Sequence, residues 1–434
     1  MRKFLFYICS LFIIIMPFSV HAILSMELTR GVAGAIPIAI VPFTDSASPQ
    51  DISQVISQDL QNSGRFKVYY RKLISVIPHA AESVSTDYFQ RLGTNNVVVG
   101  QVQQLASGQY QVKFQLLDIF RGKDASSIVL SKQFTIPHNE SRRVAHHISD
   151  LIYQQITGTR GIFSTKIAYV VVQRSGAGKA KYLLEVSDQD GYNPRPLLTS
   201  LEPIMSPAWS PNGKQIAYVS FEKRKASIYV HDVVTGSRRL LSDFPGINGA
   251  PAWSPDGTKL ALVLSKSGAP NIYIQDVNNG SLKAVTSDFY INTEPSWSPD
   301  GRSLIFTSNK SGGPQIYQYQ VGSGTISRLT FDGPYNARAS YAQDGKYITM
   351  IHRISGIYNI AMLDLDTGRM NVLNKASGDS ASPSFAPNGS MILYDTVYGG
   401  RNVLAMVSSD GRIQLRLPAR NGEAQDPAWS PFLS

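Results

Sequence analysis

The chain has 434 residues, which is too long for one ordinary domain and long enough for a sizeable core. Its single cysteine, Cys9, lies near the N-terminus, so the rest of the chain has no disulfide, no thiolate-bound metal and no cysteine nucleophile. The net charge is +10, without a run of five like charges. We interpret this charge as a solvated basic surface and not as a nucleic-acid-binding site.

The N-terminus has the pattern of a secretory signal peptide, which we place at residues 1–22. Two basic residues at 2–3 precede an apolar run over residues 4–16, and a small-residue end follows at 20–22. The apolar run is shorter than the about 20 residues that a membrane-spanning helix needs. We therefore expect cleavage between Ala22 and Ile23 and an exported, soluble protein.

Residues 23–35 form a short segment with the pattern of one β-strand followed by a flexible stretch. Apolar and polar residues alternate there in the order Leu24, Ser25, Met26, Glu27, Leu28 and Thr29. Two interpretations stay open at this point. The segment is either the first strand of the following domain or a detachable strand that adds to the sheet edge of a partner.

Residues 36–157 mix helix and strand patterns and predict a small α/β domain. We expect strands at 37–43, 66–70, 96–102, 110–119 and 127–136, with a hairpin turn near Gly108. We expect helices at 52–64, 86–92 and 139–158, the last capped by Asn139 and ended by Gly158. Residues 158–164 are expected to link this domain to the next.

Residues 165–434 form a repeat with a period of 44 residues. Each repeat places an aromatic residue at the same position, namely Trp209, Trp253, Trp297, Tyr341, Phe385 and Trp429. Turns of the type Ser-Pro-Asp-Gly follow most of these residues, and each repeat contains four strand patterns. A repeat of about 40 to 50 residues with four strands is typical of a β-propeller blade.

The two ends of the repeat array complement each other. The array begins with a second strand near residue 166 and ends with a first strand at Trp429. The C-terminal strand can therefore complete the blade that begins at residue 166, which leaves no open end. We expect an α/β N-terminal domain followed by an all-β six-bladed β-propeller that is closed by its C-terminal strand.

The sequence contains no convincing catalytic or metal-binding set. Residues 176–180 lack the first glycine and the Ser or Thr of a phosphate-binding loop, and Ser380 has no nucleophile elbow around it. His146 and His147 are adjacent on a predicted helix and point to different faces, so they do not readily share one ion. We expect a binding module that is not an enzyme, with no cofactor and no metal.

The loops that enter the aromatic-bearing strands should surround one mouth of the propeller channel, opposite the Asp-Gly turns. They carry amides, carboxylates and an arginine, which suit a protein-binding site. The candidate residues are Glu202, Met205, Asn248, Gly249, Ala250, Asn292, Thr293, Glu294 and Arg338. The alternative is a propeller that binds or processes a small ligand in its central channel.

The chain resembles the TolB family, the periplasmic propellers of the Tol-Pal system of Gram-negative bacteria. The similarity covers nearly all of the chain after the predicted signal peptide. As a set, the matching segments are specific for this family; they are residues 40–43, 59–64, 97–102, 166–171, 187–193, 205–211, 248–252 and 292–295.

This resemblance implies a non-enzymatic adaptor in the periplasm, monomeric on its own, that serves outer-membrane integrity and invagination of that membrane during cell division. The N-terminal strand, with Leu24, Met26, Glu27 and Leu28, would bind the C-terminal domain of TolA, an inner-membrane protein. The candidate residues at the channel mouth would bind Pal, a lipoprotein of the outer membrane. Nucleic acid and direct membrane insertion are not expected. The resemblance favours the detachable strand over the first strand of a domain.

Two segments depart from the family pattern. The N-terminal strand carries Met26, Leu28 and Arg30, where the family has acidic strands rich in Ile and Val. The loop at residues 246–247 lacks a basic-histidine pair that is common in the family.

Overall fold

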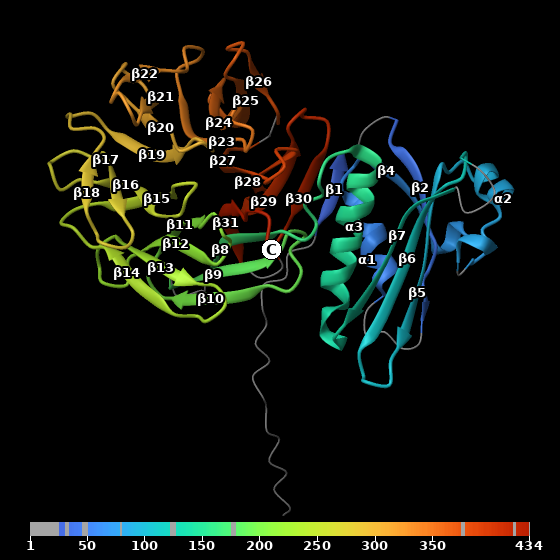
Figure 1. The fold of residues 1–434 in the computed structure, drawn as a ribbon. Coiled ribbons are helices and arrows are strands. Elements are labelled where there is room, and N and C mark those ends of the chain that lie inside the picture. Colours follow the sequence, from blue (N-terminus) through green and yellow to red (C-terminus); the bar gives the residue numbers. More distant parts are fainter. Residues whose placement is uncertain are drawn as a thin grey trace, which may run out of the picture.

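The computed structural model describes residues 26–30, 34–45, 51–78, 80–121, 127–174, 179–374, 378–419 and 422–433. The predicted signal peptide, its cleavage site at Ala22 and Ile23, and Leu24 lie outside the described residues. An α/β domain and a ring of β-sheets lie side by side (Figure 1). In the described parts of the chain, no helix is both long and apolar enough to cross a membrane.

The α/β domain is built on a sheet with the strand order β4-β2-β5-β6-β7. Its elements are β2 (Ile36–Ile40), β3 (Thr44–Asp45), α1 (Ile52–Asn62), β4 (Phe66–Tyr70), α2 (Thr86–Arg91), β5 (Asn96–Gln104), β6 (Tyr110–Asp118), β7 (Ile128–Ile136) and α3 (Ser141–Thr157). Alternate residues of β2 point to opposite faces: Ile38 packs with α1 and α3, whereas Ala39 packs on the side of α2. Two apolar layers therefore hold the sheet between α1 and α3 on one face and α2 on the other.

The helix ends show one difference from the predicted caps. The Asp51 side chain caps α1 by accepting a hydrogen bond from the Gln54 backbone N–H, at 3.1 Å. Gly158 ends α3 at φ +76°, as predicted. The predicted cap of α3, Asn139, is wrong: it lies in a 3₁₀ turn (His138–Glu140) that precedes the helix, and among the described residues no side chain caps α3.

The remaining strands form six antiparallel sheets in the described residues, which we number as blades one to six. Blade one contains β31 (Glu423–Trp429), β8 (Lys166–Arg174), β9 (Ala180–Asp188) and β10 (Arg195–Ser200). Blade two contains β11 (Ile204–Trp209), β12 (Gln215–Ser220), β13 (Ser227–Asp232) and β14 (Arg238–Ser242). Blade three contains β15 (Asn248–Trp253), β16 (Lys259–Leu264), β17 (Asn271–Asp276) and β18 (Leu282–Ala284).

The second half of the ring repeats this arrangement. Blade four contains β19 (Asn292–Trp297), β20 (Ser303–Ser308), β21 (Gln315–Gln320) and β22 (Ile326–Arg328). Blade five contains β23 (Asn336–Tyr341), β24 (Tyr347–Ile354), β25 (Ile357–Asp364) and β26 (Met370–Val372). Blade six contains β27 (Ser380–Phe385), β28 (Met391–Tyr398), β29 (Arg401–Ser408) and β30 (Gln414–Leu417).

The C-terminal strand closes the ring, which confirms the predicted fold class. Strand β31 pairs with β8, with Ala424 opposite Val171 and Trp429 opposite Ile167. The Trp429 indole N–H donates to the Thr165 hydroxyl at 2.8 Å, at the entrance to β8. Residues from opposite ends of the repeat array therefore share one blade, and no blade edge is left open at the closure.

The repeated motif is structural. Trp209 and Trp253 each donate an indole hydrogen bond of 3.1 Å to a backbone carbonyl of the preceding inner strand. In the turn that follows Trp253, the Asp256 carboxylate accepts from the Ser254 hydroxyl and the Thr258 N–H. The Ser254 hydrogen bond is the main cause that lowers the pKa of Asp256 to about 2. Trp209 and Trp253 thus connect neighbouring blades by hydrogen bonds, and the Ser-Pro-Asp-Gly turn after Trp253 stabilises its inner hairpin.

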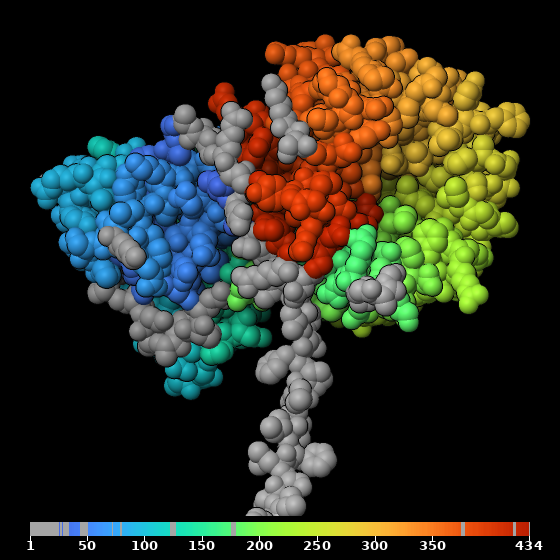
Figure 2. Space-filling model, turned by 180° about the vertical axis from the view of Figure 1, so that it is seen from behind, coloured from blue at the N-terminus to red at the C-terminus, as the bar shows by residue number. Residues whose placement is uncertain are grey.

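The N-terminal strand β1 (Glu27–Arg30) is not a first strand of the α/β sheet. It lies antiparallel to β30 at the outer edge of blade six, with Glu27 opposite Arg416 and Leu28 opposite Leu415. Figure 1 shows β1 beside β30, where the propeller meets the α/β domain, and the reverse view in Figure 2 shows that the late propeller residues, in red, face that domain. The segment before the α/β domain therefore belongs structurally to the propeller.

Ring closure predicts an unequal effect of two chemically identical substitutions. Trp429→Ala removes a buried ring and the hydrogen bond to Thr165, so we expect the free energy of unfolding to fall by about 3 to 5 kcal/mol. Trp297→Ala is the matched control, because the Trp297 indole N–H has no hydrogen-bond partner among the described residues. It should cost about 1 kcal/mol less in a chemical denaturation measurement. Equal losses would contradict a special role for the closing strand.

Candidate functional site

The inner strands of the blades enclose a central channel of about 630 Å³. Five of the predicted mouth residues line this channel: Met205, Ala250, Thr293, Glu294 and Arg338. They come from blades two to five, so residues that are far apart in the sequence converge on one cavity. The fold therefore brings together a polar and charged lining of the kind that we predicted for a binding site.

A ring of strained residues surrounds the channel. Each inner strand has a register irregularity, and within it one non-glycine residue adopts φ between +46° and +55°. These residues are Ser206, Ala250, Glu294, Arg338, Ser382 and Asp426, and all line the channel. Side chains in this left-handed region are strained, and such residues concentrate at functional sites. Three members, Ser206, Ser382 and Asp426, were not among the candidate site residues, although each lies three residues before a repeated aromatic residue.

Asp426 connects four blades across the channel. Its carboxylate accepts from Arg338 Nη2 of blade five at 2.7 Å and from the Ser382 hydroxyl of blade six at 3.0 Å. The second carboxylate oxygen accepts from the Ser206 N–H of blade two at 3.3 Å. Because Asp426 lies on the closing strand β31, ring closure also completes the channel.

The channel holds more acidic groups than basic ones. Burial alone would lower the pKa of Arg338, but the carboxylates of Asp426, Glu294 and Asp395 raise it, so the guanidinium stays charged. Burial and the nearby Asp426 raise the pKa of Asp395, whose Oδ1 has no hydrogen-bond partner among the described residues. Burial opposes ionisation of Asp426, but Arg338 lowers its pKa overall. Two carboxylates, Glu294 and Asp426, and one arginine, Arg338, line the channel, and this balance favours a positively charged group there.

The other predicted mouth residues have different surroundings. Asn248 is buried, and its side-chain oxygen accepts from the Ser242 hydroxyl at 2.8 Å and from the Phe244 N–H at 2.9 Å. Asn292 is also buried and donates to the Asp288 carboxylate at 2.6 Å. These two amides brace the loops that enter the inner strands. Glu202 is exposed in the loop before β11, and Gly249 follows Asn248 in β15.

Exposed apolar side chains gather in the loops that enter blades two to five. They are Leu201, Ile247, Phe289, Tyr290, Ile291 and Phe331, and Phe289 is 98% exposed. These loops precede β11, β15, β19 and β23, so they lie at the same mouth of the channel. None of these side chains was among the candidate site residues, because the prediction of a protein-binding site rested mainly on the polar groups of the loops. Repeated exposed apolar residues on one face are typical of a protein-binding surface.

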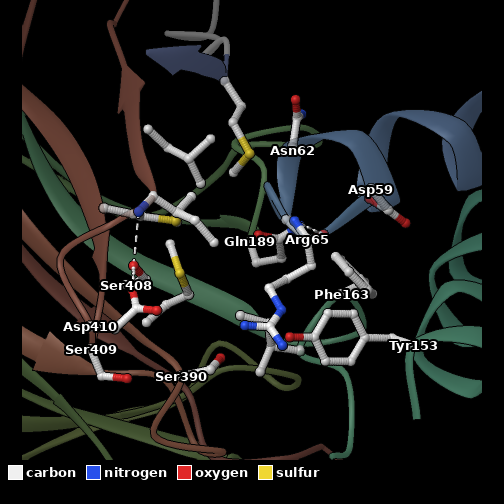
Figure 3. A pocket seen from close by; sticks show the side chains of 17 residues that line it. Asp59, Asn62, Arg65, Tyr153, Phe163, Gln189, Ser390, Ser408, Ser409 and Asp410 are labelled. Carbon is white, nitrogen blue, oxygen red and sulfur yellow. Dashed lines mark hydrogen bonds between the residues drawn. The ribbon is translucent and has the colours of Figure 1, made fainter. Parts of the chain in front are cut away.

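A second candidate site lies beneath β1, between the two domains. The pocket there has a volume of about 130 Å³. Figure 3 shows Arg65 and Tyr153 on the side of the α/β domain and Ser408 and Asp410 on the propeller side. Met26 also lines this pocket, beside Met391, Met406, Ile413 and Leu415 of blade six. Of the predicted strand residues, Met26 and Leu28 are half-buried and pack on the cluster between blades six and one. For Glu27 the structure describes only the backbone.

The two domains touch closely at Gly64. This residue follows α1 at φ +66°, and a Cβ atom added to it would lie 2.8 Å from Ile413 Cγ2 of the propeller. Only glycine combines this backbone conformation with such a close approach. The two domains are therefore tightly packed at Gly64, next to the pocket that Met26 lines.

Comparison with known proteins identifies similar chains. A family model described as the TolB beta propeller domain matches residues 153–433, and one described as the TolB amino-terminal domain matches residues 24–125. The Tol-Pal system protein TolB of Coxiella burnetii is 52% identical over 254 residues, which are 57% of this chain and 57% of that protein. The Tol-Pal system protein TolB of Legionella pneumophila is 52% identical over 243 residues, 56% of this chain and 55% of that protein. The match thus spans just over half the length of these two relatives.

One solved structure is similar over almost the whole chain. The crystal structure of TolB from Acinetobacter baumannii has a TM-score of 0.87 and 40% sequence identity. The similarity covers 94% of this chain and 100% of that one.

The charge pair at the channel predicts a non-additive effect of substitution. Asp426→Ala removes three hydrogen bonds and leaves the Arg338 guanidinium without its partner, so we expect a loss of about 3 kcal/mol in the free energy of unfolding. The double substitution Arg338→Met with Asp426→Ala should recover part of that loss, because it removes the stranded charge. Denaturant titration of both variants and of Arg338→Met completes the cycle. If the losses of free energy in the single variants add up to the loss in the double variant, Arg338 and Asp426 have no coupling energy, which would contradict this prediction.

Proposed function

The chain belongs to the TolB family of Tol-Pal system proteins, and from this premise we propose that it is a non-enzymatic adaptor in the periplasm. One end would bind the C-terminal domain of TolA, and the other end would bind Pal. Through these two contacts the protein would support outer-membrane integrity and the invagination of that membrane during cell division.

The placement of β1 is the observation that carries this proposal. In the described residues, blades one to five are complete with four strands, and blade six has the same four strands without β1. Strand β1 is a fifth strand at the outer edge, with a register irregularity between Leu28 and Arg30. It can therefore leave without opening a blade, and its unpaired edge can then add to the sheet of another protein.

The residues of β1 suit an exchange of partners. The side chains of Met26 and Leu28 lie against the propeller. The alternation of side chains along a strand would serve in a TolA complex, with Leu24, Met26 and Leu28 on the buried face and Glu27 on the other. The pocket beside Met26 keeps a volume of about 130 Å³, so the Met26 side chain does not fill this space. This incomplete packing supports a docked strand that is held weakly.

The channel mouth supports the assignment of Pal. The exposed apolar loop residues offer contact area, and the acidic channel beneath them favours a basic group of the partner. We place the contact at Glu202, Met205, Asn248, Gly249, Ala250, Asn292, Thr293, Glu294 and Arg338, with Asn248 and Asn292 shaping the loops. Phe289 and Phe331 extend this surface.

Calorimetric titration with the two partners tests the proposal. Residues 23–434 should bind both the TolA C-terminal domain and Pal, whereas a variant without residues 23–34 should bind Pal alone. Phe289→Ser should weaken Pal binding at least tenfold and leave TolA binding unchanged, since Phe289 lies at the mouth and not beside β1. If the intact chain binds neither protein, the adaptor function is wrong, and small ligands of the channel become the next candidates.

A further inference from the structure

A buried set of charged side chains joins the α/β domain to the first propeller blade. Arg142 and His146 come from α3, Asp59 from α1, and Asp188 and Asp190 from the end of β9 and the turn that follows it. His146 is 3% exposed and Asp59 is 2% exposed. We call this set of five side chains the junction network. It forms within the chain itself, without either partner protein of the proposed function.

His146 lies at the centre of the junction network. Its Nδ1 is 2.8 Å from Asp59 Oδ2, which also accepts from the Ser149 hydroxyl at 2.7 Å. Its Nε2 has no hydrogen-bond partner among the described residues and lies 4.0 Å from Asp188 Oδ2. The imidazole is therefore positioned between a carboxylate of the α/β domain and a carboxylate of the propeller.

Two permanent cations hold the propeller side of the junction network. Lys166 Nζ donates to Asp188 Oδ1 at 2.5 Å, and Arg142 Nε donates to Asp188 Oδ2 at 3.2 Å. Arg142 also pairs with Asp190 and lies over the Tyr192 ring, 3.9 Å from its centroid. Because Arg142 belongs to α3, its contacts with Asp188, Asp190 and Tyr192 cross the domain junction. The contact between Lys166 and Asp188 lies within blade one.

The charged groups around His146 indicate what a proton on its ring contributes. Asp59, Asp188 and Asp190 supply three carboxyl groups, and Arg142 and Lys166 supply two positive charges. Burial raises the pKa of Asp59, and a positive charge on His146 opposes that rise. With Asp150, which also faces the ring, the carboxyl groups outnumber the cations by two, so a proton on His146 offsets part of an excess of negative charge. A divalent metal held by Asp59, His146 and Asp190 would compete with the Arg142 guanidinium, which already pairs with Asp190, and would displace the contact between His146 Nδ1 and Asp59. Because Arg142 and the contact between His146 and Asp59 already engage these atoms, a proton fits the site better than a metal does.

One further charged group faces the imidazole. Asp150 lies one turn along α3. Burial raises the pKa of Asp150, and the nearby charge of His146 opposes that rise. Its carboxylate accepts from the backbone N–H groups of Phe163 and Ser164 at 2.7 and 3.1 Å, in the linker between the domains. It thus fixes the linker, and its hydrogen bonds are satisfied without the proton on His146.

We propose that His146 is a proton-operated latch: its protonated ring holds the α/β domain against blade one, and loss of that proton loosens the domain junction. Deprotonation would leave Asp59 and Asp188 facing a neutral ring across a buried interface. Uncompensated buried charge is costly, so the two domains would gain freedom to move apart.

The direction of the pH dependence follows from the surroundings of His146. Burial alone would lower the pKa of His146, but the Asp59 carboxylate raises it above its ordinary value of 6.5. For a group whose pKa is raised on folding, the stabilising contribution is complete below the unfolded-state pKa and is lost as the pH rises through the folded-state pKa. The latch is therefore closed at pH 6 and opens at a pH above 6.5.

A distance measurement between the domains tests the latch. The chain has no cysteine after Cys9, so Gln90→Cys on α2 and Ser323→Cys between β21 and β22 give two unique, exposed positions for spin labels. Pulsed electron paramagnetic resonance on residues 23–434 should show a narrow distance distribution at pH 6. The distribution should broaden as the pH rises to 9, with a midpoint above 6.5.

Three variants separate the latch from other causes. His146→Gln should abolish the pH-dependent step, whereas His147→Gln, at the exposed neighbouring position, should leave it unchanged. Asp59→Asn should move the midpoint to lower pH, because it removes the carboxylate that raises the pKa of His146. A distribution that is independent of pH, or a step that persists in His146→Gln, would overturn the proposal. So would a step that disappears with a chelator and returns with zinc, since the site would then be a metal centre.

Discussion

The pairing of β31 with β8 is the interaction on which the rest of the structure depends. It brings the last strand of the chain into the blade that the first propeller strands begin, and so makes one closed ring out of an open array. The same strand carries Asp426, which binds groups from three other blades across the channel. Ring closure and completion of the channel are therefore one event, and disruption of β31 would affect both.

Closure also means that the ring of six blades is complete without the N-terminal strand. Blade six already contains β27 to β30, so β1 adds to a finished sheet and protects its outer edge. The propeller thus presents two separate surfaces: the channel mouth, with Phe289 and Phe331, and the junction with the α/β domain, with the seat of β1. Asp59 belongs to the junction network and also lines the pocket beneath β1. The packing of the two domains and the seating of the strand are accordingly parts of one interface.

Much of the fold could be predicted from the sequence, because the features that encode it are local or periodic. The 44-residue period, with Trp209 and its counterparts, predicts the blades, and the offset of the last repeat predicts the closure. The strained ring with Ser206 and Asp426 shares that period, but its backbone conformation leaves no residue-type signature, since serine, alanine, glutamate, arginine and aspartate all occupy it. The docking of β1 on β30 and the junction network around His146 join segments that are far apart in the chain. Pairing of this kind depends on tertiary packing, which the alternation of residues in a single strand cannot specify.

The central claim is that β1 cannot lie on blade six and bind a partner at the same time. A disulfide between Glu27→Cys and Arg416→Cys tests it most directly, because these positions are opposed in the β1–β30 pair and the chain after Cys9 has no other cysteine. The affinity of this variant for the TolA C-terminal domain should be measured by calorimetry before and after reduction, with Pal as the control partner. We expect the oxidised protein to bind Pal but not TolA, and the reduced protein to bind both. Equal TolA binding in the two states would contradict the claim.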